Sequence, residues 1–335
     1  MSAAEDVVTE APAVEAVPKR AMTLGMGTSL VVLAALIIMP IFVKNFIIFQ
    51  MTMLLIYGLA VLALNILTGG SGQFSLGQSA FYAVGAYTSA VLMEYFNVNY
   101  ALTIPISAVV CFGFGYLFGK PALRLSGVYL ALATFALATA MPQLLKLNFL
   151  EHWTGGVQGI VIIKPDAPFG LPLNSDQWLY FFTLAVALLM FLLGRNLLNG
   201  RVGRAMQAIR DHHLASEAMG INTALYKSLT FGVSAMYMGV AGALGAIAVQ
   251  FVAPDSFGFF LSLTFLVGIV IGGLASISGA LYGALFIQFV PNIADEISKA
   301  APWAIFGIFL IAFVYVMPSG IAGAVRMLLA RRRSP

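Results

Sequence analysis

Long apolar runs without charged residues constrain this chain more than any other feature of its sequence. The run over residues 46–67 contains no Asp, Glu, Lys or Arg, and runs of similar length recur along the chain. About 20 mostly apolar residues are needed for a helix to cross a bilayer. With 61% hydrophobic and 9% charged residues, the chain is far from the composition of a soluble globular domain. The sequence therefore predicts an all-α polytopic integral membrane protein.

We expect about ten transmembrane helices, within a range of eight to ten because two Gly-rich stretches are candidates for re-entrant segments. The expected spans are residues 21–43, 46–67, a third that ends near Glu94, 101–119, 125–147, 178–198, 228–251, two short spans divided at 275–278, and 302–318. Residues 1–20 are predicted to be a disordered cytoplasmic tail. Residues 21–320 form the predicted transmembrane domain, and residues 321–335 a basic cytoplasmic tail.

The distribution of positive charge predicts which loops face the cytoplasm. With ten spans, thirteen of the seventeen Lys and Arg residues fall on the side that holds both termini. Cytoplasmic loops of membrane proteins collect Lys and Arg. Both termini and the loop over residues 199–227 are therefore expected in the cytoplasm, and the loop over residues 148–177 outside it.

A Gly-rich stretch after the second span is the predicted lining of a translocation pathway. It begins TGGSGQFSLG at Thr68, with four glycines in ten residues, which interrupts a regular helix. Interrupted helices at membrane depth are tolerated only against protein or a water-lined cavity. The candidate pathway residues are Asn65, Gln73, Ser75, Gln78, Ser79 and Tyr82. The alternative is that the small residues of this stretch only allow close packing of helices.

The sequence of the loop over residues 199–227 predicts an amphipathic helix over residues 203–219. Its expected apolar face contains Ala205, Met206, Ala208, Ile209, Ala215 and Met219, and its polar face includes Arg204, Gln207, Arg210 and Glu217. Gly220 suits the C-terminal cap of this helix, and Asn222 suits the N-terminal cap of the next one. Such a helix either lies on lipid or binds a partner, whereas the alternative is a solvated cytoplasmic connector.

Neither a metal site nor an enzyme active site is apparent in the sequence. His212 and His213 are adjacent and would point to different faces of a helix, and no Cys or carboxylate completes a set of ligands at suitable spacing. The chain has no nucleotide-binding motif, and no buried carboxylate that would suit a proton-driven carrier. A self-sufficient secondary carrier or channel for urea or short amides is the alternative to a transporter driven by partner subunits.

Three long segments of the sequence resemble a known family. They are LNILTGGSGQFSLGQSAFYAVGAYTSAVL, RDHHLASEAMGINTALYKSLTFGVSAMYMGVAGAL and APDSFGFFLSLTFLVGIVIGGLASISGALYGA. Together they are similar to the permease subunit of branched-chain amino-acid ABC importers, of the LivM type rather than the LivH type. The similarity spans residues 46–318.

The resemblance implies a subunit of a bacterial inner-membrane importer that carries branched-chain amino acids or a related small neutral solute. Its implied partners are a second, LivH-type permease, two cytoplasmic ATPases that bind ATP and Mg²⁺, a periplasmic binding protein and membrane lipid, but no nucleic acid. The loop over residues 199–227 would be the ATPase-docking loop. Its implied docking residues are Arg204, Arg210, Glu217, Ala218 and Gly220, and its Glu–Gly spacing is shorter than that common in other ABC importers.

Overall fold

The computed structural model describes residues 36–40, 42–122, 125, 127–168, 172–297, 299 and 302–331 of the chain. The chain divides into two compact units, Met1–Lys44 and Asn45–Pro335. Residues 36–40 of the first unit are helical. The second unit contains all the elements that carry the candidate sites.

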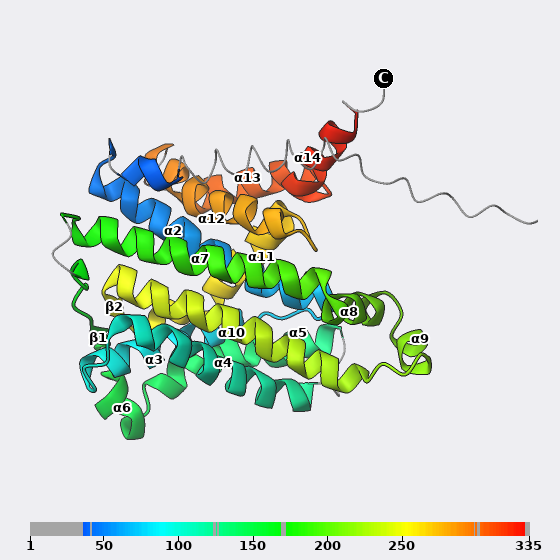
Figure 1. Cartoon of the computed structure of the whole chain (residues 1–335), viewed down its shortest axis with the longest axis horizontal. Coiled ribbons are helices and arrows are strands. Elements are labelled where there is room, and N and C mark those ends of the chain that lie inside the picture. Colours follow the sequence, from blue (N-terminus) through cyan, green and yellow to red (C-terminus); the bar gives the residue numbers. More distant parts are fainter. Residues whose placement is uncertain are drawn as a thin grey trace, which may run out of the picture. The chain divides into compact units, whose positions relative to one another are not determined.

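Helices account for almost all of the second unit, which confirms the predicted all-α membrane fold (Figure 1). The longer helices are α2 (Asn45–Leu64), α3 (Gln78–Glu94), α4 (Tyr100–Ala122), α5 (Val128–Leu145), α7 (Ser175–Asn199), α10 (Thr223–Val249), α11 (Phe259–Gly272), α12 (Ile277–Ile297), α13 (Pro302–Val316) and α14 (Gly320–Arg331). The shorter elements are the π-helix η1 (Asn65–Gly70), α6 (Asn148–Thr154), β1 (Ile160–Val161), α8 (Arg201–Asp211), α9 (His213–Ala218), β2 (Phe251–Val252) and the 3₁₀-helix η3 (Pro254–Phe257).

Within the described residues, eight helical segments are long and apolar enough to cross a membrane. Helix α3 has 17 residues, about the shortest length that spans a bilayer. The expected first span, residues 21–43, lies almost entirely outside the described residues. The total of ten transmembrane spans and the cytoplasmic position of both termini therefore stay predictions.

Helices α2 and α10 form the buried centre of the unit. In the apolar stretch of α2–η1, 72% of the residues are buried, and in that of α10, 83% are buried. Helix α10 makes its most extensive contacts with α4 and α3, and α2 packs against α10, α12 and α7. At Gly239 on α10, an added Cβ would lie 2.6 Å from the Cβ of Cys111 on α4. Small residues at such crossings let helices approach closely, which stabilises helix association in a membrane.

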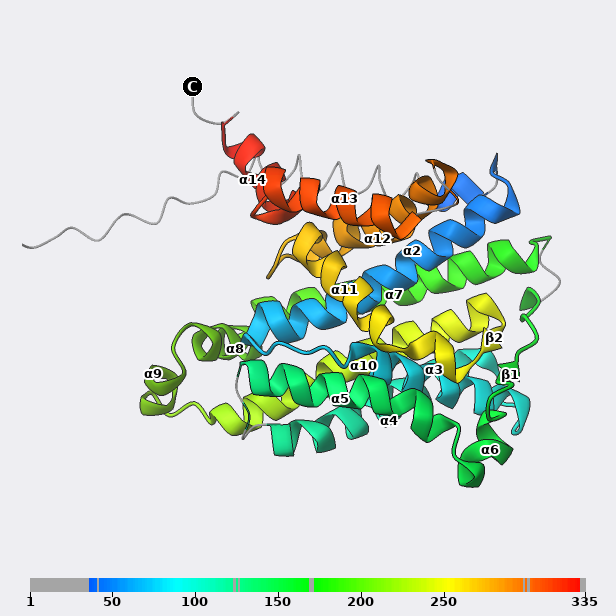
Figure 2. The same ribbon diagram turned by 180° about the vertical axis from the view of Figure 1, so that it is seen from behind.

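The two long loops lie at opposite ends of the helical bundle. Helices α8 and α9 occupy one end, and α6 with the strands β1 and β2 occupies the other (Figure 1). The antiparallel pairing of Ile160 with Val252 joins the 148–177 loop to the segment after α10. The ion pair between Lys146 and Asp255, 2.5 Å from Nζ to Oδ1, joins the end of α5 to η3. Seen from behind, α11 lies between α2 and α5 (Figure 2).

Cysteine labelling should report these two ends as opposite sides of the membrane. Asp166 and Gln207 are exposed at the two ends, and the native Cys111 is buried, so a Cys111→Ser background leaves one reactive thiol per variant. In sealed cells, an impermeant maleimide should label Asp166→Cys and reach Gln207→Cys only after the membrane is permeabilised. Labelling of both variants in sealed cells would contradict the predicted topology.

Both Gly-rich interruptions predicted from the sequence are confirmed. Helix α2 continues into η1 as far as Gly70, slightly beyond the expected end of the second span. Ser71 closes this helix, and residues 72–77 then run without helical structure before α3. The second interruption covers residues 273–276, between α11 and α12. A π-helix inserted at the end of an α-helix is uncommon and often marks a functional site.

One detail of the expected secondary structure is wrong. The single helix predicted over residues 203–219 is divided at His212, whose φ of −150° and ψ of 94° are extended, so that α8 and α9 are separate helices. Ala215 and Met219 consequently do not share the buried face of Met206 and Ile209 and are exposed. The segment expected as a basic tail over residues 321–335 begins as helix α14.

Candidate functional site

Helix α8 packs its apolar face on the end of the interrupted helix α2–η1. Met206 and Ile209 are buried, whereas Arg204 and Gln207 are exposed on the opposite face. A Cβ added to Gly70 would lie 3.0 Å from the terminal methyl of Met206. The amphipathic pattern predicted for this half of the loop is therefore confirmed, and its apolar face covers protein.

The segment α8–α9 ends in the two caps that the sequence predicts. Gly220 has a φ of +82°, and the amide of Ile221 donates to the carbonyl oxygen of Ser216 at 3.0 Å, which closes a left-handed C-terminal cap. The side chain of Asn222 accepts a hydrogen bond from the amide of Leu225 at 3.0 Å and caps α10. The loop is thus a fixed structural element between α7 and α10.

Glu217 holds α9 to the start of α10. Its Oε1 accepts a hydrogen bond from the hydroxyl of Thr223 at 2.6 Å and lies 3.7 Å from Nδ1 of His213. About half of the Glu217 side chain is exposed, so the same carboxylate also faces outward. Of the other predicted docking residues, Ala218 and Gly220 are exposed beside it, and Arg204 is exposed with Nη1 3.4 Å from the carbonyl oxygen of Asn199.

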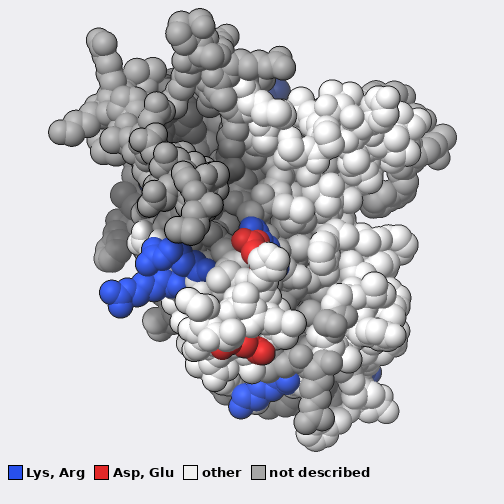
Figure 3. All heavy atoms as spheres, turned by 90° about the vertical axis from the view of Figure 1, so that its right-hand side faces the viewer, with Lys and Arg blue, Asp and Glu red and all other residues white. Residues whose placement is uncertain are grey.

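Two large apolar side chains project from this otherwise polar segment. Leu214 is 80% exposed and Met219 is 83% exposed. The sequence interpretation placed Met219 on the same apolar face as Met206 and Ile209, and it did not consider Leu214. Leu214 directly follows His212 and His213, and such a large apolar side chain next to polar residues is the signal that could have found it. In the view onto this end, Lys and Arg side chains form separate groups around a largely uncharged surface that also carries acidic side chains (Figure 3).

Arg210 connects α8 directly to the interrupted helix. Its Nη1 donates to the carbonyl oxygen of Gly69 at 2.7 Å, and its Nε donates to Asp211 at 3.0 Å. A Cβ added to Gly72, whose φ is +72°, would lie 2.9 Å from Cγ of Arg210. This predicted docking residue therefore binds the last turn of η1, and a movement of α8 would pull on that turn.

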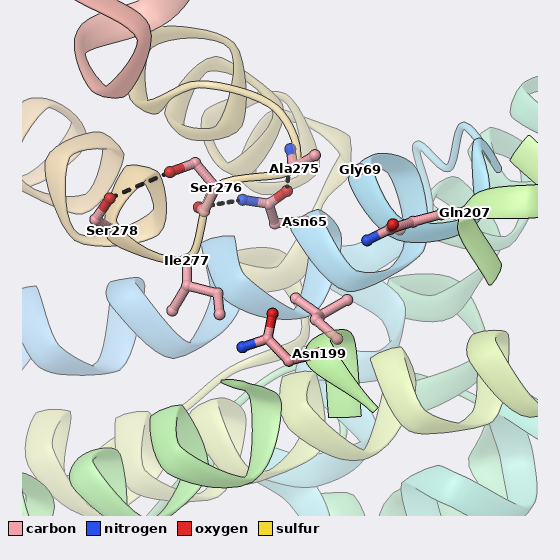
Figure 4. Close-up of a pocket in the computed structure, with 10 residues that line it drawn as sticks. Asn65, Gly69, Asn199, Gln207, Ala275, Ser276, Ile277 and Ser278 are labelled. Carbon is pink, nitrogen blue, oxygen red and sulfur yellow. Dashed lines mark hydrogen bonds between the residues drawn. The ribbon is translucent and has the colours of Figure 1, made fainter. Parts of the chain in front are cut away.

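Asn65 joins the first interruption to the second one (Figure 4). Its Nδ2 donates to the carbonyl oxygen of Ser276 at 2.7 Å, and its Oδ1 accepts from the amide of Ala275 at 2.8 Å. Ala275 has a φ of +57°, a conformation that residues with a Cβ adopt rarely. Gly69 leaves room for this contact, since an added Cβ there would lie 2.6 Å from the Ala275 nitrogen. We name this arrangement the Asn65 bridge.

A polar cavity of about 240 Å³ lies beside the Asn65 bridge. Its walls come from η1, the end of α7, α8 and the second interruption, as Figure 4 shows. Its polar side chains belong to Asn65, Asn199, Gln207, Ser276 and Ser278. The cavity thus lies where the loop over residues 199–227, represented by Gln207, meets both interrupted helices.

The remaining pathway candidates are buried, and most of them bind other helices. Gln73 donates to Ser71 at 2.8 Å and to the carbonyl oxygen of Lys227 at 3.3 Å. Ser75 accepts from the amide of Gly77 at 3.3 Å. These contacts hold the irregular segment 72–77 in place. A Cβ added to Gly77 would lie 2.7 Å from the carbonyl oxygen of Thr134, so this glycine allows α5 to approach.

Gln78 and Ser79 belong to a buried polar cluster at the start of α3. Nε2 of Gln78 donates to Ser234 on α10 at 3.4 Å, while its Oε1 is buried without a hydrogen-bond partner in the structure. The amide of Ser79 donates to Ser262 on α11 at 2.9 Å, and the two hydroxyls are 2.8 Å apart. Tyr82 lies one turn further along α3, at a second cavity. The structure thus distributes the six candidates along α2–η1, the irregular segment and α3 instead of gathering them in one cavity.

No group of three or more His, Cys, Asp or Glu side chains in the described part of the chain is arranged to hold a metal ion. His213 instead lies near Glu217 within α9. The polar groups that the structure brings together are amides, hydroxyls and one guanidinium. Such groups bind neutral or zwitterionic molecules through hydrogen bonds and hold helices together.

Comparison with known proteins identifies the family. Residues 46–318 match the family described as "Branched-chain amino acid transport system / permease component". The chain belongs to this permease family. The LivM permease of the high-affinity branched-chain amino acid transport system of Salmonella typhimurium is 30% identical over 299 residues, which cover 82% of this chain and 69% of the relative. The LivM protein of Escherichia coli K12 matches to the same extent.

The LivH permease of the same Salmonella system is a more distant relative. It is 24% identical over 288 residues, which cover 80% of this chain and 91% of LivH. No solved structure matched the chain. The chain is therefore a LivM-type permease subunit of a multi-subunit ABC importer, and a multi-pass protein of the inner membrane. This assignment decides against the self-sufficient carrier or channel that the sequence left as an alternative.

Proposed function

We propose that this permease forms part of the translocation pathway for branched-chain amino acids, or for a related small neutral solute. The names of its relatives support the substrate class, since LivM and LivH are both described as branched-chain amino acid permeases. The chain supplies the route and binds no cofactor of its own. ATP and Mg²⁺ are bound by two cytoplasmic ATPase subunits, and a second, LivH-type permease and a periplasmic binding protein complete the importer.

The exposed apolar residues of α9 carry the proposal that α8–α9 is the ATPase-docking segment. A polar segment in water gains nothing from exposing Leu214 and Met219, whereas a partner that covers them buries two large apolar side chains. Full burial of such a side chain stabilises an interface by about 1.5–3 kcal/mol. Glu217, Ala218 and Gly220 are exposed next to these residues in the chain, and Arg204 is exposed on α8. Arg210, bound to Gly69, would transmit the movement of α8 to the interrupted helix α2–η1.

Replacing Leu214 by aspartate should release the ATPases. We expect at least about tenfold less ATPase to co-purify with Leu214→Asp, because the buried contact is lost and a charge is desolvated. Glu217→Lys should have a similar effect, since it removes the bond to Thr223 and reverses a charge at the interface. The matched control is Ile163→Asp, which changes an 84% exposed apolar residue at the other end of the bundle. Normal retention of the ATPases by both α9 variants would refute the docking proposal.

ATP-dependent uptake tests the substrate. The permease would be reconstituted with its LivH-type partner, the two ATPases and the binding protein, and uptake of leucine, urea and benzoate compared. Leucine uptake that requires ATP is the expected result. Uptake of urea or benzoate but not of leucine would show that the importer carries another solute.

A further inference from the structure

A second cavity, of about 130 Å³, lies at the end of the bundle that carries β1 and β2. It is enclosed by side chains from α2, α3, the end of α10, β2, η3 and the start of α11. Its lining residues are Met53, Tyr57, Tyr82, Gly245, Ala246, Val249, Phe251, Ser256, Phe257 and Leu261. It is a different cavity from the polar one at the Asn65 bridge, with which it shares no lining residue.

Aromatic rings form the inner wall of this cavity. The ring of Tyr82 lies 6.0 Å from that of Phe257 and 5.7 Å from that of Phe265, measured between centroids. The ring of Tyr57 lies 6.0 Å from that of Phe265 at an angle of 64°. Rings at these distances and angles support one another, so the wall is rigid. A rigid, mostly apolar wall with few polar groups is typical of a small-molecule site.

Three hydroxyls, those of Tyr57, Tyr82 and Ser256, are the polar side-chain groups of the cavity. Tyr82 is only 6% exposed, and among the described residues neither its hydroxyl nor that of Tyr57 has a hydrogen-bond partner. Neither hydroxyl oxygen is among the fully buried polar atoms without a partner, so both are accessible and can bind a ligand or a water in the cavity. Gly245 makes room for the Tyr82 hydroxyl, because a Cβ there would overlap the oxygen atom.

The cavity opens on the side opposite to the docking segment. Val249, Phe251 and Ser256 line it and are exposed, whereas Tyr82, Ala246 and Phe257 at its inner part are buried. Its volume of about 130 Å³ is several times the minimum needed to hold one water, so a small aliphatic group such as the side chain of leucine has room there. An apolar cavity of this size takes a small aliphatic group and leaves polar atoms of the ligand at the hydroxyls or the mouth.

We propose that this cavity is a binding site, on the extracytoplasmic side of the permease, for the aliphatic side chain of a small neutral amino acid. Tyr82, Phe257 and Leu261 enclose the side chain, and the hydroxyls of Tyr57 and Tyr82 bind polar atoms of the solute or of a water that accompanies it. This site rests on the proposed function and deepens it. The permease itself selects its solute by side-chain size, in addition to the selection made by the binding protein.

Changing the size of Leu261 should shift selectivity in opposite directions. In the reconstituted importer with its binding protein saturated, Leu261→Phe fills the cavity and should lower the ratio of leucine to valine uptake rates about fivefold. Leu261→Ala enlarges the cavity and should lower discrimination against isoleucine and longer side chains. Leu263→Ala is the matched control, since Leu263 lies on the same helix with similar exposure but does not line the cavity. Unchanged rate ratios in both Leu261 variants would overturn the proposal.

Cysteine protection tests the site without transport. Ser256→Cys in the Cys111→Ser background places a thiol at the mouth, and an impermeant maleimide should modify it in the whole importer in lipid nanodiscs. Leucine should slow this reaction at least fivefold, while glycine, which has no side chain, should not. The proposal would be overturned if both amino acids protected the thiol equally or if leucine did not protect it. It would also be overturned if the thiol did not react because lipid covers it. Wild-type uptake of leucine tests the proposed function separately, because it does not depend on either substitution.

Discussion

Replacing Gly85 by valine should remove most of the folded permease from the membrane. Gly85 is the point where α3 crosses α10, and an added Cβ would overlap the carbonyl oxygen of Gly239 and lie 2.5 Å from its Cα. The obstructing atoms belong to the backbone, so no side-chain rotation relieves the overlap and the two helices must separate. Overpacking of a well-packed core costs about 1–3 kcal/mol when side chains can adjust, and we expect more here.

Gly113→Val is the matched control for this prediction. Gly113 also lies inside a spanning helix, α4, but nothing lies within 4 Å of a Cβ added there. The two substitutions carry the same intrinsic helix propensity, so any difference reports the crossing. Fluorescence-detected size-exclusion chromatography should show a single monodisperse peak for Gly113→Val and little or none for Gly85→Val. Equal yields of the two variants would show that α3 and α10 do not pack as described.

Replacing Asn65 by leucine should both destabilise the permease and uncouple transport from ATP hydrolysis. The leucine side chain cannot accept the Ala275 amide or donate to the Ser276 carbonyl, so the two bonds of the Asn65 bridge are lost at once. A buried amide left without an acceptor costs about 1–3 kcal/mol, and we expect about 2–4 kcal/mol for the whole bridge. Ala275, with its φ of +57°, then loses the contact that holds it in a strained conformation.

The consequence for transport follows from the chain of contacts. Arg210 on α8 binds the Gly69 carbonyl, and Asn65 of the same π-helix binds the second interruption. Movement of α8 would reach both interruptions through these bonds. In Asn65→Leu, ATP hydrolysis by the reconstituted importer should continue while solute uptake falls at least about tenfold.

Asn199→Leu is the control for the Asn65 prediction. Asn199 lines the same cavity and undergoes the same chemical change, but it takes no part in the bridge. Its unfolding midpoint and its coupling ratio should stay close to those of the wild type. Asn65→Asp keeps the acceptor for Ala275 and loses only the donor, so an intermediate effect is expected. A midpoint for Asn65→Leu equal to that of Asn199→Leu would exclude a role for the bridge in stability.

The sequence by itself determined the class of fold and the local signals along the chain. Apolar runs of spanning length have few ways to satisfy their backbone in lipid, so they form helices. Glycine stabilises a helix poorly, so the glycines after residue 68 and around residue 275 interrupt the helices there. Gly220 and Asn222 act within one helical turn, so their caps were readable from neighbouring residues alone.

Only the tertiary structure decided which polar residues meet. Asn65 binds residues more than two hundred positions later in the chain, and no local pattern predicts that contact. The division at His212 was also hidden, since neither Gly nor Pro marks it and the helical periodicity of apolar residues continues through it. Met206 and Ile209 are buried beneath α8, but no residue in the described part of the chain covers Leu214 and Met219. Burial depends on what lies opposite a side chain, and that is a property of the folded molecule rather than of the sequence around it.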